Sequence, residues 1–152
     1  MRKFALDTNL YVRSIRNPAD AGDLGRFYSA FAPSLYLSSI VLHELLIGAD
    51  GELKVKQIHR DIAGPFDRTG RIFAPSHRSW VAAGEALAKL ASTGDLDRRA
   101  LPRSFINDVL LAASCREAGI TLVTDNGRDF MRIARVLPCE FVEPWPRSLS
   151  QD

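Results

Sequence analysis

Short apolar segments alternate along this chain with longer segments in which apolar residues recur every three or four positions. The short segments predict strands at residues 3–6, 35–37, 71–74, 120–123 and 140–142. The longer segments predict helices at residues 20–31, 40–48, 52–66, 76–91, 105–118 and 129–136. Strands that alternate with helices form a parallel sheet with helices on both faces. The chain is therefore expected to adopt an α/β fold.

Residues at several predicted boundaries have the preferences that helix ends require. Ser38 or Ser39 is the expected N-cap of the helix that follows the second strand, and Ser104 that of a later helix. Gly119 is expected to close that later helix. The helix at residues 52–66 is expected to stop around Gly64-Pro65.

The length of 152 residues fits one ordinary domain. We expect that domain to span residues 1–142. Residues 143–152 contain two prolines and no periodicity, so they are expected to form a C-terminal tail. Residues 92–103 contain a glycine, a proline and several charges and are expected to form a loop.

Composition excludes several classes of protein. The net charge of +2 does not by itself indicate nucleic-acid binding. The two cysteines, Cys115 and Cys139, belong to no zinc motif, and Cys115 is expected to be buried in an apolar helix. The N-terminus lacks the apolar core of a signal peptide, and no apolar run approaches a membrane span. The expected location is the cytoplasm.

Acidic residues stand at positions where an isolated charge is costly. Asp7 and Asp125 follow the ends of predicted buried strands, and Glu44 and Asp108 interrupt apolar helices. A buried carboxylate must be paired, protonated or bound to a cation. Converging carboxylates favour a hard divalent ion such as Mg²⁺, or Mn²⁺.

Each of these acidic residues also has a purely structural interpretation, but all four would have to apply together. The alternatives are a helix N-cap for Asp7, a turn residue for Asp125, an ion pair with Arg103 or Arg116 for Asp108, and partial exposure beside His43 for Glu44.

Taken in order, four segments resemble the PIN domain, and in particular the VapC toxins of bacterial toxin–antitoxin pairs. They are Leu6-Asp7-Thr8-Asn9, Leu42-His43-Glu44-Leu45, Asn107-Asp108 and the run from Thr124 to Phe130. The resemblance covers residues 3–141. It implies a three-layer α/β/α fold around a four- to five-stranded parallel sheet, with metal ligands at Asp7, Glu44 and Asp108.

The last of these segments departs from the family pattern. In the family, the acidic or Asn position falls two residues after the threonine, and here Asn126 occupies it. Asp125 lies one residue early, and Asp129 lies further on. Asp125, Asn126 and Asp129 therefore all stay open as the fourth residue of the site.

The resemblance implies hydrolysis of RNA phosphodiesters with bound Mg²⁺, or Mn²⁺ in its place. Thr8 and Thr124 are expected to contact the substrate phosphate or to position the carboxylates. Arg103 borders the predicted site and is a weaker candidate for substrate binding. The full set of candidate phosphate contacts is Arg13, Arg16, Lys54, Lys56, Arg98, Arg99 and Arg103.

The resemblance also implies a homodimer and neutralisation by a small cognate antitoxin. The apolar surface of the helices at residues 20–31 and 40–48 is the expected antitoxin receptor, with Tyr28 and Phe31 as contacts. The alternative is that these aromatic residues belong to the hydrophobic core.

Two other functions stay open at this point. A phosphohydrolase of small phosphate esters suits a strand-end aspartate, although Asn9 stands where a haloacid-dehalogenase-type enzyme has its second aspartate. A non-catalytic binding module with the same fold is the other alternative, for which Asn126 is a hint. No phosphate-binding glycine motif supports a nucleotide-binding protein.

Overall fold

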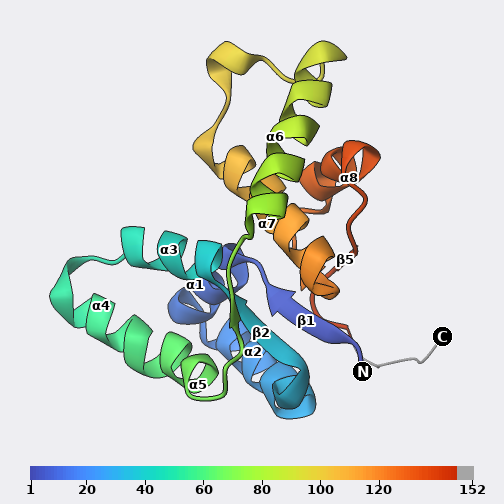
Figure 1. Ribbon diagram of the computed structural model, residues 1–152. Coiled ribbons are helices and arrows are strands. Elements are labelled where there is room, and N and C mark those ends of the chain that lie inside the picture. The colour runs from blue at the N-terminus through green and yellow to red at the C-terminus, as the bar shows by residue number, and fades with distance from the viewer. Residues whose placement is uncertain (147–152) are drawn as a thin grey trace.

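A computed structural model describes residues 1–146, which form a five-stranded parallel sheet surrounded by helices (Figure 1). The strands are β1 (Lys3–Leu6), β2 (Leu35–Ser38), β3 (Ile72–Phe73), β4 (Ile120–Val123) and β5 (Phe141–Val142). Their order in the sheet is β3-β2-β1-β4-β5. All five predicted strands are confirmed, and the α/β class with them.

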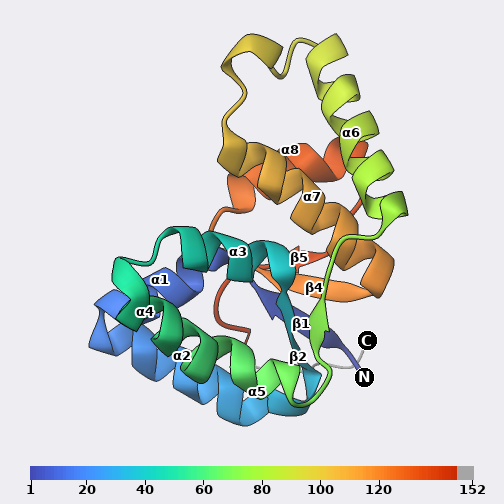
Figure 2. The ribbon, with the colours of Figure 1, turned by 60° about the vertical axis from the view of Figure 1, so that its left-hand side comes forward.

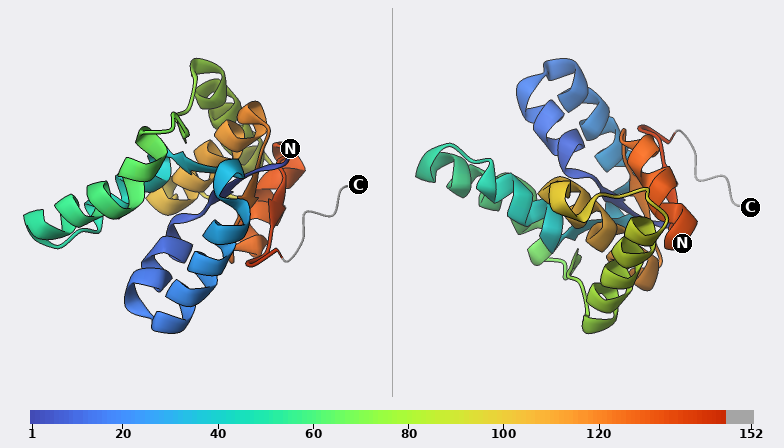
Figure 3. Two further views of the ribbon diagram at one scale, coloured as in Figure 1. Left: turned by 90° about the horizontal axis from the view of Figure 1, so that it is seen from below. Right: turned by 90° about the horizontal axis from the view of Figure 1, so that it is seen from above.

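The helices connect the parallel strands and cover both faces of the sheet. They are α1 (Thr8–Arg16), α2 (Pro18–Phe31), α3 (Ser39–Ile47), α4 (Gly51–Ile58), α5 (Gly64–Asp67), α6 (His77–Ser92), α7 (Arg103–Ala118) and α8 (Gly127–Val136). Short helical turns are η1 (Ala32–Ser34), η2 (His59–Ala63) and η3 (Arg98–Ala100). Figure 3 shows α1 and α2 on one face and α6 and α7 on the other, which is the expected three-layer arrangement.

The strands form because their side chains are apolar on both faces, as a sheet covered on both sides requires. Phe4, Ala5 and Leu6 are all buried in β1, and every residue of β4 is buried. Phe4 also joins an aromatic cluster, with its ring centroid 5.8 Å from that of Phe27 and 5.5 Å from that of Phe31.

The strand order creates a crevice beside β1. The chain runs outward from β1 to β2 and β3, and then returns to place β4 on the other side of β1. Ligands of open α/β sheets bind at such a switch point, at the carboxyl ends of the strands. In Figure 2, α1 and α3 lie beside the end of β1, and α7 and α8 lie above it.

Two of the predicted caps are confirmed and one is wrong. The Ser38 hydroxyl accepts a hydrogen bond from Ile40 N–H (3.2 Å), and Gly119 ends α7 with a φ of 64°. The predicted N-cap at Ser104 is wrong, because α7 begins at Arg103. Pro102 occupies the N-cap position, and its carbonyl accepts hydrogen bonds from the backbone N–H groups of residues 105 and 106.

The helix predicted at residues 52–66 is confirmed as a continuous helical path from α4 to Asp67, which Gly64 and Pro65 do not interrupt. A π-helical turn, η2, widens the helix just before the proline. Gly64 N–H then bonds the carbonyl of His59, five residues earlier. This wider turn accommodates a residue that has no N–H to donate.

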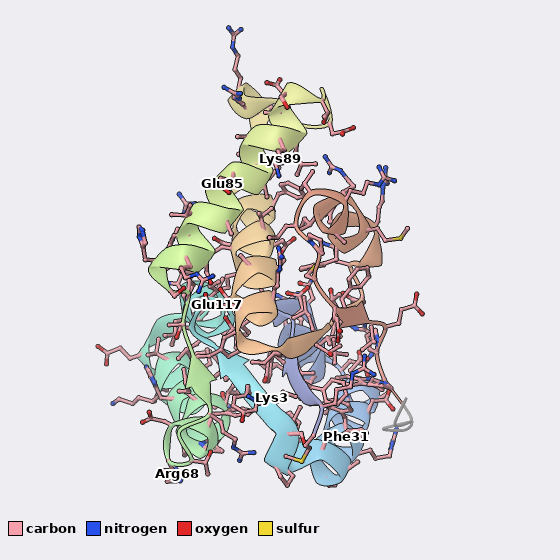
Figure 4. All side chains as sticks on the ribbon, turned by 45° about the vertical axis from the view of Figure 1, so that its right-hand side comes forward. Lys3, Phe31, Arg68, Glu85, Lys89 and Glu117 are labelled. Carbon is pink, nitrogen blue, oxygen red and sulfur yellow. The ribbon has the colours of Figure 1, made fainter. Side chains whose placement is uncertain are left out.

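Beyond the sheet, α6 and α7 extend away together and are joined by the predicted loop (Figure 4, where Glu85 and Lys89 mark α6). The expected C-terminal tail is described only up to residue 146, and residues 147–152 lie outside the described part. Within the described part of the tail, the ring centroid of Trp145 lies 5.3 Å from that of Phe27.

Cys115 is buried as expected, and both cysteines are free. No helix within residues 1–146 combines the length and apolar character needed to cross a membrane.

Candidate active site

Asp7 and Thr124 meet at the carboxyl ends of two adjacent strands. The β1–β4 register pairs Leu6 with Val123, so the next residue of each strand lies at the same edge. Thr124 Oγ1 donates to Asp7 Oδ2 (2.7 Å), and Thr8 N–H donates to Asp7 Oδ1 (2.8 Å). Asp7 is therefore the N-cap of α1 and also a rigid carboxylate at the switch point, with lone pairs left on both oxygens.

Glu44 and Asp108 approach Asp7 from two helices. Glu44 lies in the second half of α3 and Asp108 in the second turn of α7, and each is partly buried. Both helices have apolar residues on nearly every side, so they pack deeply and bring these single carboxylates inward. The expected trio therefore lies together, although its members are far apart in the sequence.

The electrostatics of the trio indicate strained, closely spaced charges. Burial, followed by the negative charges of Asp7, Glu44 and Asp129, raises the pKa of Asp108 to about 8. Burial and then the charge of Asp7 raise the pKa of Glu44. Burial also raises the pKa of Asp7, despite the hydrogen bonds from Thr124 and Thr8. Each shift records a cost of holding these groups ionised without a cation between them.

Asn126 occupies the fourth position beside this trio. Its Nδ2 lies 3.1 Å from Asp129 Oδ2 and 3.4 Å from Asp108 Oδ2. The amide thus donates toward two carboxylates. Asp125 faces the opposite way, and its Oδ2 accepts a hydrogen bond from Arg13 Nη1 (2.8 Å).

The donor set fits a hard divalent cation. It offers oxygen atoms from carboxylates and from the buried Thr8 hydroxyl. That hydroxyl has no partner within hydrogen-bond distance among residues 1–146, although it lies near enough to Glu44 to lower the pKa of that carboxyl in part. Within the same residues, no three acidic, His or Cys side chains converge tightly enough to enclose an ion alone. Mg²⁺ suits a site whose side chains do not enclose the ion, because it keeps several waters and binds one or two carboxylates together with substrate phosphate.

The expected substrate contacts lie in different settings. Thr8 and Thr124 are buried at the site itself. Arg103 is exposed at the start of α7, before the turn that carries Asp108. Arg13 is engaged by two carboxylates, those of Asp125 and Asp20, and is thus less available for phosphate than the sequence suggested.

We predict that Thr124→Val lowers the RNA cleavage implied by the family resemblance about 10- to 100-fold, because the hydroxyl orients the Asp7 carboxylate and groups behind metal ligands have effects of this size. Its loss also leaves Asp7 Oδ2 and Asn126 N–H without a buried partner, since Thr124 Oγ1 accepts from that N–H at 3.0 Å. Single-turnover kinetics on RNA measures the effect. Thr124→Ser keeps the hydroxyl and is expected to keep most activity; equal losses in both variants would contradict this role.

The PIN domain family matches residues 4–136 of the chain. This span includes every residue of the site described above. The chain belongs to the PIN-domain family, among the VapC ribonucleases. Ribonuclease VapC2 of Haemophilus influenzae is 33% identical over 138 residues, covering 88% of this chain and 93% of the relative. The tRNA(fMet)-specific endonuclease VapC of Shigella flexneri is 30% identical over 136 residues, with the same coverage.

Solved structures agree with this PIN-domain assignment. DNA-bound VapBC from Salmonella typhimurium matches with a TM-score of 0.67 and 25% identity, over 94% of this chain and 98% of that one. FitAcB from Neisseria gonorrhoeae matches with a TM-score of 0.69 and 18% identity, over 93% and 98%. The second likeness shows the fold alone.

Sequence reasoning missed two features of this PIN domain. Arg13 bridges Asp20 and Asp125, and the Asn107 side chain lies close enough to Glu44 to lower its pKa in part. The bridge joins residues 112 positions apart, and no local pattern signals it. The proximity of Asn107 to the predicted ligand Asp108 was the one available hint for the second feature.

Proposed function

We propose that this protein is a metal-dependent endoribonuclease whose cation is held by Asp7, Glu44 and Asp108. The observation that carries the proposal is the proximity of these carboxylates at the switch point of the sheet, where burial and then the charges of Asp7 and Glu44 raise the pKa of Asp108 to about 8. Several carboxylates close together are unfavourable at a site for a neutral ligand, because their negative charges repel each other. The family assignment supports the choice of a nuclease.

In this mechanism the protein supplies carboxylates that are already held in position before the substrate binds. Bound Mg²⁺ or Mn²⁺ would polarise the scissile phosphoryl group and make a water more acidic. Asp7 is fixed by two hydrogen bonds and so holds its position without reorganisation. Glu44, at the other side, would orient the water. Asn126 bridges Asp108 and Asp129 by donating toward both.

We expect Asp7→Asn to abolish cleavage of RNA while the fold is kept. The test incubates antitoxin-free protein with total RNA and with Mg²⁺, Mn²⁺ or a chelator, beside the variant. Metal-dependent cleavage by the wild type alone supports the proposal. Full activity of Asp7→Asn, free of wild-type contamination, would refute it.

Transfer RNA is the substrate that we propose to examine first. The Shigella flexneri relative is named a tRNA(fMet)-specific endonuclease. Sequencing the ends of the fragments from total RNA would identify the target without assuming it. A parallel panel of sugar phosphates tests the phosphohydrolase alternative, and metal binding without cleavage of either class would indicate a binding module.

We further propose that a cognate antitoxin docks in an apolar groove between α4 and the α1–α2 pair, which diverge as two arms in Figure 3. The groove encloses about 350 Å³ and has Leu24, Tyr28 and Ile62 among its walls. An amphipathic helix suits such a groove. An adjoining groove shares Ile15 and reaches Glu44, so an occupant would lie beside the active site.

This surface differs in part from the one expected from the sequence. Tyr28 lines the groove as expected, and its hydroxyl lies 2.9 Å from that of Tyr11. For Phe31 the alternative that the sequence left open holds, because this side chain belongs to the hydrophobic core. Only 7% of it is exposed, and it packs between Phe4 and Phe27 at the end of α2 (Figure 4). The walls come from α1, α2, α4 and η2, whereas α3 borders only the adjoining groove.

We expect Ala21→Arg to weaken antitoxin binding about 100-fold, because it places a long charged side chain in a groove whose walls are mostly apolar. The measurement is co-purification with the co-expressed antitoxin, followed by titration of the inhibition of RNA cleavage. Ala30→Arg, at an exposed position of α2 outside the groove, is the matched control. Undiminished binding by Ala21→Arg would place the antitoxin elsewhere. The homodimer stays a prediction, which sedimentation of the isolated protein tests.

A further inference from the structure

Arg13 links three elements at the edge of the site. Its Nη1 donates to Asp125 Oδ2 and its Nη2 donates to Asp20 Oδ1, each at 2.8 Å. Arg13 lies in the last turn of α1, and Asp20 lies in the first turn of α2. Asn17 ends α1 and caps α2, so the two helices meet at a fixed corner. The guanidinium therefore lies at this corner and binds Asp125 in the segment that follows β4.

Within that segment, three consecutive side chains face different partners. Thr124 faces Asp7, and its hydroxyl also accepts the backbone N–H of Asn126, which makes a tight turn. Asn126 faces Asp108 on α7. Asp125 lies between Thr124 and Asn126 in the sequence, and its carboxylate accepts a hydrogen bond from Arg13 instead.

The placement of Asp125 matters because the site is already strongly anionic. Its carboxylate is near enough to raise the pKa of Asp7 even while it is paired with Arg13. Without that pair, the charge of this carboxylate would be uncompensated beside Asp7. It would then be free to approach the cation and to compete with the amide of Asn126. The side chains of Arg13 and Asp125 are 48% and 31% exposed, so the pair itself adds little to folding stability.

We propose that Arg13 is a positioning residue of the active site. Together with Asp20 it holds Asp125 on the α1 side of the turn, so that Asn126 faces Asp108 and Asp129. The function of Asp125 is then to anchor the turn, and the fourth position of the site belongs to Asn126. This inference rests on the proposed metal site.

The test uses the full chain without antitoxin and compares wild type, Arg13→Gln, the double variant Arg13→Gln/Asp125→Asn, and Arg26→Gln. The last is a matched control, since it also breaks an arginine–aspartate pair, with Asp23 on α2. Two quantities are measured: Mn²⁺ affinity without RNA, from the electron paramagnetic resonance signal of free Mn²⁺, and kcat and KM for RNA cleavage. Circular dichroism verifies that each variant is folded.

In Arg13→Gln we expect Mn²⁺ to bind about fivefold more tightly, because a positive charge is lost beside an anionic site. We expect kcat to fall about tenfold with KM nearly unchanged, as for groups that orient metal ligands. Asp125→Asn in the same chain should restore both quantities, and Arg26→Gln should match wild type.

Other results would overturn the inference. A raised KM that Asp125→Asn does not rescue would make Arg13 a contact for RNA phosphate. Identical behaviour of Arg13→Gln and Arg26→Gln would make the bridge an ordinary surface pair. If the wild type cleaves no RNA, the proposed function fails, but the Mn²⁺ affinities and their rescue still decide the role of Arg13.

Discussion

Asp108→Asn is expected to lower kcat for RNA cleavage by about 10²–10³-fold, because it removes a charged ligand from an electrostatically organised site. Asparagine keeps the size of the side chain, so the fold should be unchanged. Asp67→Asn, at an exposed position in α5, is the matched control and should retain full activity. Initial rates at saturating Mn²⁺ measure the effect, and a loss smaller than about fivefold would remove Asp108 from the ligand set.

The same substitution should make the metal-free protein more stable near and above neutral pH. The pKa of Asp108 rises on folding from 3.8 to about 8, so the folded chain binds a proton that the unfolded chain releases. The contribution of this group to stability is therefore fully present below pH 3.8 and is lost as the pH rises toward about 8. We expect the melting temperature of Asp108→Asn to decline less than that of wild type across this range, in chelator. Parallel melting curves would contradict the inferred strain.

Phe27→Ala is expected to lower the free energy of unfolding by about 3–5 kcal/mol, the usual cost of emptying a buried aromatic site. Phe27 is 3% exposed, and its ring centroid lies 4.7 Å from that of Phe31 and 5.3 Å from that of Trp145. The melting temperature should fall by roughly 10 °C for a chain of this size.

Met131→Ala is the control for this prediction, since Met131 is an apolar residue of α8 that is 59% exposed. Its free energy of unfolding should stay within about 0.5 kcal/mol of wild type. A loss below about 1 kcal/mol in Phe27→Ala would show that the aromatic cluster contributes little.

Local sequence patterns predicted the element types well. Four-residue apolar runs such as Lys3–Leu6 and Ile120–Val123 form strands because burial on both faces suits them. Gly119 ends α7 because glycine adopts a positive φ without a steric cost. The error at Ser104 arose because Pro102, two residues earlier, already occupies the N-cap position of α7.

The candidate site was predictable to a different degree at each position. Asp7, Glu44 and Asp108 were identifiable because a charge in an apolar strand or helix needs a partner. Their order also resembled a known family. Asp125 and Asn126, in contrast, are adjacent in sequence and equally polar, so their roles depended on the direction in which each side chain points.

The sequence by itself thus determined the α/β architecture, the family and the carboxylates that a cation would need, because periodicity and misplaced charge are local properties. Only the tertiary structure decided which polar group faces the site and which aromatic residues are buried. Arg13 reaches Asp125 across 112 positions, and Phe31 enters the core through Phe4 and Phe27. These contacts depend on strand order and helix packing, which bring together residues that no local pattern connects.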